Sequence, residues 1–389
     1  MSCDRTRSLR RGAALHHRGL ACLAHGRRSA LAVLAVAGLL AVAACSSSNS
    51  TPAPAGSGNG TPASGSGQGS TSSPAAEPGI VAVTTGGALV VLNPATGAVT
   101  RTLVSSGVAA SGDFGEDEIA VSPDGGTIYF TGRSNCTDQI ESVPASGGTP
   151  TVITTGDSPA ISASGADLAF ARQGDGDCGQ QWAQSFSVVV RTISTGNQTV
   201  YPMEPDDAGQ VLPSYIEHLS WAPDGSNLAV STTEYQDNYG YKVVILSPAT
   251  AQFYLTGPGT TSVPVTGSPD ASGSYYNEGV YLPDGNLFVN RDCCLGVPGP
   301  GHAPPADSNL MQEVSSSGSL VKNVAIGIQQ DDHTSLSVDP TGNWLLYIAG
   351  TPGGTDANGT VPPTGALYVS QGGARPTQIT TGILAAAWL

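Results

Sequence analysis

The stretch that decides the fold is Leu219-Ser-Trp-Ala-Pro-Asp-Gly225, followed by Asn227-Leu-Ala-Val230. Two short apolar segments flank a turn in which each residue has a separate role. Pro fixes φ at the first corner, Asp hydrogen-bonds the nearby backbone, and Gly supplies a positive φ. Apolar runs on both sides of such a turn predict a β-hairpin.

The hairpin unit recurs in phase along the chain. The other copies are Ile119-Ala-Val-Ser-Pro-Asp-Gly125 with Thr127–Phe130, Val280-Tyr-Leu-Pro-Asp-Gly285 with Asn286–Val289, Leu336-Ser-Val-Asp-Pro-Thr-Gly342 with Trp344–Tyr347, and a degenerate copy, Ala160-Ile-Ser-Ala-Ser-Gly165 with Asp167–Phe170. Two further strand candidates follow each hairpin, so each repeat supplies four short antiparallel strands. The turns stand at positions 123, 163, 223, 283 and 340, and this spacing is typical of propeller blades.

The two ends of the repeat region supply one further blade. The start reads as three strands without a leading one, and Ile383–Leu389 reads as a leading strand without its hairpin, with Trp388 at the place of Trp221. Pairing these ends closes a ring and leaves no unpaired edge at the join. We therefore expect an all-β, six-bladed β-propeller of four-stranded antiparallel blades, closed by N- and C-terminal strands in one blade. The alternative is a pair of β-sandwiches, but a sandwich fold would not be expected to repeat regularly every four strands.

The Ser-Pro-Asp-Gly type of hairpin after an apolar strand resembles the TolB-like, or WD-like, six-bladed propeller repeat. The resemblance covers roughly residues 79–389, through five internal copies and the closing blade. It implies that loops between second and third strands, and loops entering first strands, share one face around a central channel. It also implies protein–protein contact within a cell envelope, although a fold does not fix a function.

The first 44 residues are chemically unlike the rest. They hold seven Arg and one acid, and they end in an apolar run, Ala30–Ala44. This run is shorter than the roughly 20 residues of a membrane-spanning helix and fits the core of a signal peptide. Small residues before Cys45 resemble a lipobox. We expect residues 1–44 to be a lipoprotein signal peptide and Cys45 to carry lipid, including palmitate. An ordinary secretory signal is the alternative, and a twin-arginine route stays open.

Residues 45–78 form the next segment, which is nearly all Ser, Gly, Pro, Thr, Ala and Asn. Such a composition buries no core, so we expect a disordered linker. Residues 79–389 then form the propeller domain. The expected location is extracytoplasmic, at the cell membrane, with contact to the membrane through the lipid anchor only. We expect a monomer.

The net charge of the chain limits the classes of partner that it can bind. The chain carries 15 Lys and Arg against 30 Asp and Glu, and without residues 1–44 it keeps 8 basic and 29 acidic residues, a net charge of −21. Such a surface repels phosphate backbones, so nucleic acid is excluded as a partner. Cations, basic peptides and neutral glycans fit better. The alternative is that the acidity only keeps a secreted domain soluble.

Four cysteines remain after the signal peptide and Cys45. Cys136 and Cys178 both follow the second strand of neighbouring repeats, and in an oxidising compartment we expect them to form a disulfide. Cys293 and Cys294 would then form a vicinal disulfide or stay as thiols. No His/Cys spacing supports a metal site.

Long loops on a rigid scaffold are where binding usually occurs. The insertions in the repeats hold Trp182 and the run that contains Tyr235, Asp237, Asn238, Tyr239 and Tyr241. Aromatic rings beside amide and carboxyl groups suit a glycan or peptide surface. The alternative is a surface loop that folds on itself.

A second candidate group stands just before the first strand of each repeat. Its members include Glu118, His218 and Glu278, with Ser158 and Ser335 in phase and His333 nearby. A ring of carboxylates and imidazoles at the channel mouth would suit Ca²⁺ or another cation. The alternative, which we favour, is a set of hydrogen-bonded loop-end residues, so we expect no cofactor and no metal.

No enzyme signature occurs in the sequence: there is no Gly-x-Ser-x-Gly, no His-Glu-x-x-His and no phosphate-binding glycine loop. We assign no catalytic residue. The expected function is a membrane-anchored binding or scaffold module for an envelope protein, peptide or glycan. The alternative is an extracytoplasmic hydrolase or lyase that uses channel-mouth carboxylates and His218 or His333. The sequence does not identify the ligand.

Overall fold

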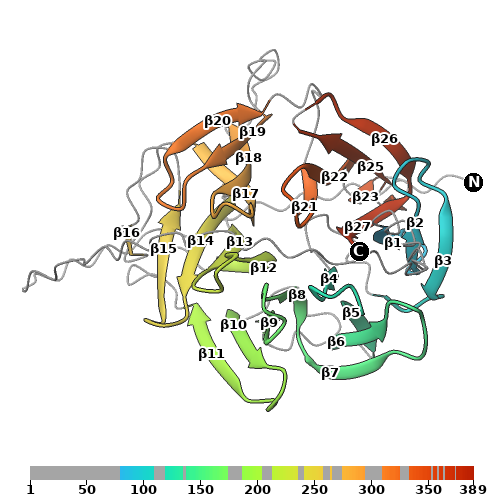
Figure 1. Ribbon diagram of the computed structural model, residues 1–389, viewed down its shortest axis with the longest axis horizontal. Helices are drawn as coiled ribbons and strands as arrows, with labels where there is room; N and C mark the ends of the chain where they lie inside the picture. Colours follow the sequence, from blue (N-terminus) through green and yellow to red (C-terminus); the bar gives the residue numbers. More distant parts are fainter. Residues whose placement is uncertain are drawn as a thin grey trace, which may run out of the picture. The chain divides into compact units, whose positions relative to one another are not determined.

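The computed structural model describes residues 79–108, 119–134, 137–173, 186–203, 213–234, 241–256, 263–264, 274–293, 309–324, 333–351, 354–356, 359–361, 364–372 and 374–389. The chain divides into two units, residues 1–70 and 71–389, and all described residues belong to the second. The described strands of that unit form six antiparallel sheets arranged in a ring, as Figure 1 shows, and one separate two-stranded hairpin. Within the described part of the chain no helix has the length and hydrophobicity needed to cross a bilayer.

Each sheet is one blade, and its strands are given from the inside of the ring outward. Blade 1 consists of β27 (Ile383–Trp388), β1 (Ile80–Thr84), β2 (Leu89–Leu92) and β3 (Val99–Val104). Blade 2 consists of β4 (Ile119–Val121), β5 (Thr127–Ser134), β6 (Thr137–Pro144) and β7 (Thr151–Thr155). Blade 3 consists of β8 (Asp157–Ile161), β9 (Asp167–Gln173), β10 (Phe186–Thr192) and β11 (Gln198–Met203).

The other three blades repeat this order with small additions. Blade 4 consists of β12 (Pro213–Trp221), β13 (Leu228–Glu234), β14 (Tyr241–Ser247) and β15 (Gln252–Thr256), with β16 (Val263–Pro264) on its outer edge. Blade 5 consists of β17 (Ser274–Tyr281), β18 (Leu287–Cys293), β19 (Asn309–Val314) and β20 (Leu320–Val324). Blade 6 consists of β21 (His333–Val338), β22 (Trp344–Thr351), β25 (Thr364–Gln371) and β26 (Thr377–Thr381). A separate hairpin, β23 (Gly354–Asp356) with β24 (Gly359–Val361), lies between β22 and β25 in sequence.

Blade 1 is built from both ends of the described chain. β27 pairs with β1, with Ile80 opposite Trp388 and Val81 opposite Ala387. The N–H of Leu389 donates to the carbonyl of Gly79 at 2.8 Å, so the two ends are adjacent. The expected six-bladed fold closed by terminal strands is therefore confirmed.

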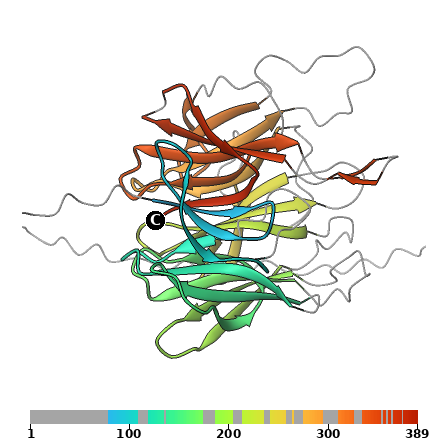
Figure 2. The same cartoon turned by 90° about the vertical axis from the view of Figure 1, so that its right-hand side faces the viewer.

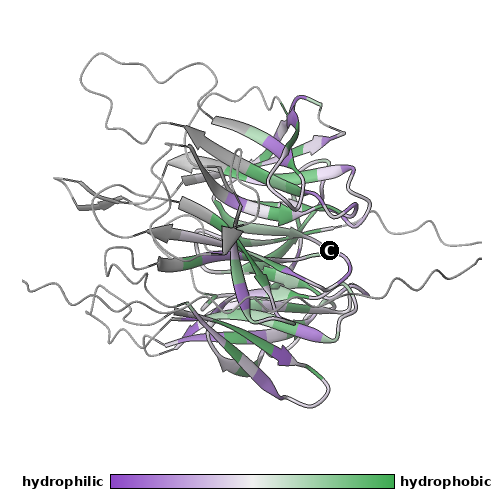
Figure 3. Ribbon diagram, turned by 90° about the vertical axis from the view of Figure 1, so that its left-hand side faces the viewer, coloured by the Kyte–Doolittle hydropathy of each residue, from purple (hydrophilic) through white to green (hydrophobic). Residues whose placement is uncertain are grey.

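Six apolar clusters hold the ring together, one at each junction between neighbouring blades. The alternation of side chains along a strand produces this arrangement. In β1, Ile80 and Ala82 pack toward blade 6, whereas Val81 and Val83 pack toward blade 2. Each blade is thus apolar on both faces, which is why its strands read as nearly continuous Val, Ile, Leu and Ala. Figure 3 shows the apolar residues along the strands and hydrophilic residues at turns and outer strands.

The hairpin turns share one hydrogen bond across all five repeats. The side chain just before the turn glycine accepts an N–H from two residues later. Asp124, Asp224 and Asp284 serve as acceptors in blades 2, 4 and 5, with Ser164 in blade 3 and Thr341 in blade 6. The degenerate copy therefore keeps its turn, because the Ser164 hydroxyl accepts the bond in place of the missing carboxylate.

The turn of blade 4 makes stability depend on pH. The Ser226 hydroxyl and then its N–H donate to the Asp224 carboxylate at 2.7 and 2.9 Å, and they lower the pKa of Asp224 from 3.8. A lowered pKa means that the folded state prefers the carboxylate, so this contribution is present above pH 3.8 and is lost as the pH falls through the folded-state value. We expect Asp224→Asn to lower Tm at pH 7 and to converge with the wild type in acid. Ser226→Ala, measured in parallel by thermal unfolding, should show a weaker form of the same trend; a Tm difference that is constant with pH would contradict this.

The strand order divides the connections between two ends of the ring. At one end, which we call the turn face, every connection between described strands is a short turn, such as residues 122–126 between β4 and β5. The opposite end, the loop face, carries the connections between second and third strands and those from one blade to the next. Figure 2 shows the β23–β24 hairpin projecting at the loop face, on the side away from the C-terminus.

Candidate functional site

Besides β27, whose ladder with β1 shifts between Ile383 and Ala385, four of the innermost strands contain a register irregularity at the same place in the repeat. The ladder shifts between Asp157 and Ala160 in β8, between Ile216 and His218 in β12, between Tyr276 and Glu278 in β17, and between Thr334 and Ser337 in β21. A β-bulge breaks the regular alternation and turns side chains in a new direction. In these blades it falls at the polar residues that the sequence placed before the first strands.

That predicted placement needs a correction. β12 begins at Pro213 and β17 begins at Ser274, so His218 and Glu278 lie inside strands and not before them. Their side chains are buried, with residue exposures of 6% and 5%. The reason is that the bulge interrupts the apolar alternation, so the strand continues through residues that read as a loop end.

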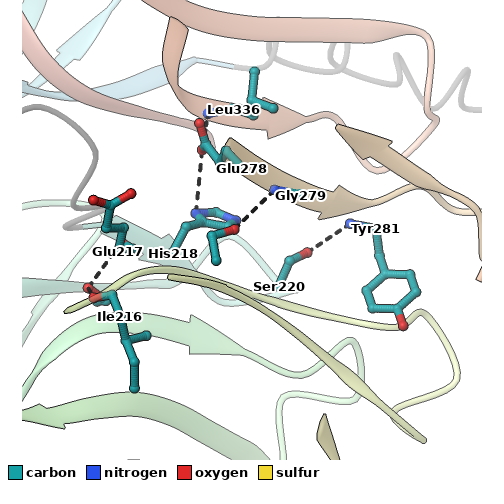
Figure 4. Close-up of polar contacts among 10 residues, drawn as sticks. Ile216, Glu217, His218, Ser220, Glu278, Gly279, Tyr281 and Leu336 are labelled. Atoms are coloured by element: carbon teal, nitrogen blue, oxygen red, sulfur yellow. Dashed lines mark hydrogen bonds and ion pairs between the residues drawn. The ribbon is translucent and has the colours of Figure 1, made fainter. Parts of the chain in front are cut away.

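His218 and Glu278 form an ion pair between blades 4 and 5 when the imidazole is protonated. Nδ1 of His218 lies 3.7 Å from Oε1 of Glu278. The same carboxylate oxygen accepts the N–H of Leu336, in β21 of blade 6, at 2.6 Å. Figure 4 shows the Glu278 side chain between the imidazole and this amide. One carboxylate therefore connects three consecutive blades, and the bond to the amide offsets part of the cost of its burial.

Ser158 makes the matching contact between blades 3 and 4. Its hydroxyl donates to the carbonyls of Ile216 and Glu217, at 3.5 and 3.2 Å, next to the bulge in β12. Ser158 is 1% exposed and has a φ of 51°. Residues other than glycine adopt this left-handed backbone conformation only at a cost in free energy. The surrounding hydrogen bonds hold it there.

Hydroxyl groups of neighbouring blades satisfy further main-chain amides of the inner strands. Ser231 accepts the N–H of Gly279 at 3.1 Å, and Thr131 accepts the N–H of Ser158 at 3.3 Å. Because bulges and free strand edges leave such amides without a ladder partner, a buried hydroxyl at this place prevents an unsatisfied donor. We name Ser158, His218, Ser231, Glu278 and the amides of Gly279 and Leu336 the central polar cluster.

Ser231 and Thr131 were not identified from the sequence. Both stand six residues after the turn glycine, Gly225 or Gly125, in the second strand of their blade. A hydroxyl side chain at the same place of two repeats, inside an otherwise apolar strand, is the signal that would have found them.

The remaining sequence candidates are not placed. Glu118, Trp182, Tyr235, Asp237, Asn238 and Tyr239 lie outside the described residues, as do Cys45, Cys136, Cys178 and Cys294. Tyr241, Cys293 and His333 stand at the ends of β14, β18 and β21, and only their main chain is described. Binding at these residues and the disulfide pairing therefore stay predictions.

The chemistry of the central polar cluster is that of a structural network. Its groups bond to one another across blades, and the two ionisable members form a pair. Among the described residues, no three His, Cys, Asp or Glu side chains gather in a way that would hold a metal ion. The observed role of the cluster is to join blades 3, 4, 5 and 6.

Comparison with known proteins establishes the fold and nothing finer. No family model matches the chain, and no curated protein matches its sequence. TolB from Acinetobacter baumannii is 15% identical, with a TM-score of 0.50, over 80% of this chain and 66% of that one. A putative TolB from Agrobacterium tumefaciens gives 14% identity and a TM-score of 0.48 over 79% and 90% of the chains, respectively. An oligogalacturonate lyase from Vibrio parahaemolyticus is 12% identical, with a TM-score of 0.38, over 70% of this chain and 78% of that one. This chain thus spans 66% of the first TolB, and its fold is that of a TolB-like propeller.

Proposed function

We propose that this TolB-like propeller is a lipid-anchored, extracytoplasmic binding module that presents its loop face to a protein or peptide of the cell envelope. The observation that carries the proposal is the unequal length of the connections at the two faces. The turn face has only short turns, whereas the loop face has much longer connections, such as residues 257–273 between β15 and β17. Long loops on a rigid scaffold usually carry binding residues.

The longer connections between second and third strands belong to one part of the ring. They comprise residues 174–185 in blade 3, 235–240 in blade 4, 294–308 in blade 5 and 352–363 in blade 6, whereas blades 1 and 2 have only the short segments 85–88 and 135–136. The connections in blades 3 and 4 hold the candidate binding residues Trp182, Tyr235 and Tyr239. The strand ends that flank these connections belong to four consecutive blades and lie on one side of the loop face.

Charge favours a basic partner. The loop-face connections contain fifteen Asp and Glu and no Lys or Arg, and these acids occur in segments 105–118, 174–185, 204–212, 235–240, 257–273, 294–308, 325–332 and 352–363. The turn-face connections contain four Asp and one Arg. A field of one sign steers oppositely charged partners. A protein or peptide that exposes Lys and Arg, together with side chains that pack against aromatic rings, fits this face best. A neutral glycan is the second choice.

The expected anchor fits the same proposal. In the sequence, a basic segment, an apolar run and Cys45 precede a segment rich in Ser, Gly and Pro. As the disordered linker that its composition predicts, about 32 residues would have a mean reach of about 30 Å. A lipid at Cys45 would hold the propeller near the membrane while leaving its loop face free to meet a partner.

In-cell crosslinking followed by pull-down tests the proposal. The wild type is compared with the triple variant Tyr235→Ala, Tyr239→Ala, Tyr241→Ala and with a turn-face control, Thr195→Ala with Ser316→Ala. We expect a specific envelope partner with the wild type and the control, and a loss of at least about tenfold with the triple variant, because buried aromatic residues carry much of the energy of an interface.

Equal capture by all three proteins would contradict binding through this loop. Capture by none would remove the binding proposal, and the enzymatic alternative would then be tested with hydrolase and lyase substrates on His218→Gln and His333→Gln variants.

A further inference from the structure

We propose that the His218–Glu278 pair is a proton-operated link between blades 4, 5 and 6, which tightens when His218 gains a proton and loosens when it loses one. This inference goes beyond the proposed function and does not depend on a partner. It rests on three features of the central polar cluster: the 3.7 Å contact of the pair, its burial, and the bond of Glu278 to a main-chain amide.

The geometry gives Glu278 two tasks in different blades. Its carboxylate faces the imidazole of His218 at 3.7 Å and accepts the Leu336 N–H at 2.6 Å through the same oxygen. A bond of this length to an amide is typical of an ionised acceptor. The position of the Leu336 amide, at the bulge of β21, therefore depends on where the pair holds this carboxylate.

The charged groups around His218 are ones that would attract a protonated imidazole. Among the residues whose side chains the structure describes, the titratable groups of the inner strands at this level are all acids: Asp157 of β8, Glu217 of β12 itself and Glu278 of β17. β13 contributes the neutral Ser231 and Thr232, and β21 contributes the Leu336 amide. Burial alone opposes a charged imidazole, whereas a carboxylate at this distance favours it.

The sign of the pH effect follows from proton linkage. If the folded protein holds the His218 proton more tightly than the unfolded chain does, the contribution of the link is present below about pH 6.5 and is lost as the pH rises through the folded-state titration. His is the side chain that titrates in this range. The link would therefore be tight in mildly acidic surroundings and looser at pH 8.

Amide hydrogen exchange of the full-length chain tests this directly, because the Leu336 N–H is itself part of the link. We expect the protection of this amide, corrected for the intrinsic pH dependence of exchange, to be on the order of tenfold higher at pH 5.5 than at pH 8. A tenfold change in an equilibrium constant is what a shift of about one pKa unit produces. The Leu228 amide, within β13, is the internal reference and should not change. In His218→Gln the difference at Leu336 should disappear.

Two results would overturn the proposal. One is equal or greater protection of Leu336 at pH 8 in the wild type, and the other is a pH difference that persists in His218→Gln. A second measurement, independent of any variant, is the ring-carbon NMR titration of His218 in the wild type. An imidazole that stays neutral at pH 5.5 would also reject the link.

Discussion

Deletion of residues 383–389 is expected to abolish the folded monomer. This segment contains β27, the innermost strand of blade 1, and its side chains Ile383 and Trp388 are 3% and 6% exposed. They pack against blade 6, whereas Ala385 packs toward blade 2, so the deletion opens two of the six blade junctions. Each large side chain that loses its burial costs about 1.5–3 kcal/mol. With the lost pairing to β1, the total approaches the roughly 5–15 kcal/mol of a whole domain.

Circular dichroism, size-exclusion chromatography and limited proteolysis will measure the effect of the deletion. The matched control is a circular permutant in which a short Gly-Ser linker joins Leu389 to Gly79 and the chain is opened between Gly147 and Gly148. Because the two ends already meet through a 2.8 Å hydrogen bond, this permutant should fold like the parent. A truncated protein that unfolds cooperatively as a monomer would show that β27 does not close the ring.

Glu278→Ala should destabilise the propeller by about 3–5 kcal/mol, the cost expected when one partner of a buried charged pair is removed. The change leaves the Leu336 N–H without its acceptor and leaves His218 without its carboxylate. It also opens a small cavity between blades 4, 5 and 6. Urea unfolding at pH 7 provides the measurement.

Glu278→Gln separates the two tasks of this side chain. The amide oxygen can still accept the Leu336 N–H, so we expect the loss to be about half of that of Glu278→Ala. Arg133→Ala is the control for an ordinary ion pair, since the side chains of Arg133 and Asp138 are 48% and 28% exposed, and it should cost at most about 1 kcal/mol. If Glu278→Ala cost no more than Arg133→Ala, the central polar cluster would have no role in joining blades.

The architecture could be predicted because its signals are local and repeated. Each hairpin has its own turn residues, and five copies in phase fix the number of strands per blade. The blade 3 copy still formed because a hydroxyl at Ser164 accepts the bond that the other turns give to Asp or Thr. Closure followed from the count of strands at the two ends, with Trp388 in the phase of Trp221.

The central polar cluster could be predicted only in part. The phase of the repeat brought His218 and Glu278 into one group, and the structure brings them to 3.7 Å. Their burial inside strands was missed, because the bulge interrupts the apolar alternation of the strand, so these residues read as a loop end, and only the pairing of two strands shows where a bulge lies. The partners of the inner amides, such as Ser231, come from a neighbouring blade, which a single repeat does not reveal. The β23–β24 hairpin has no apolar alternation and was missed for that reason.

Photo-crosslinking from single positions on the two faces shows whether a partner binds at the loop face. A photoreactive residue is placed at 235 or 303 for the loop face and at 195 or 316 for the turn face, in the anchored protein in its native envelope. We expect one crosslinked partner from the loop-face positions, with a yield that falls when salt is added, as is usual for charged contacts, and none from the turn-face positions. A partner that crosslinks from 195 or 316 and not from 235 or 303 would contradict this expectation.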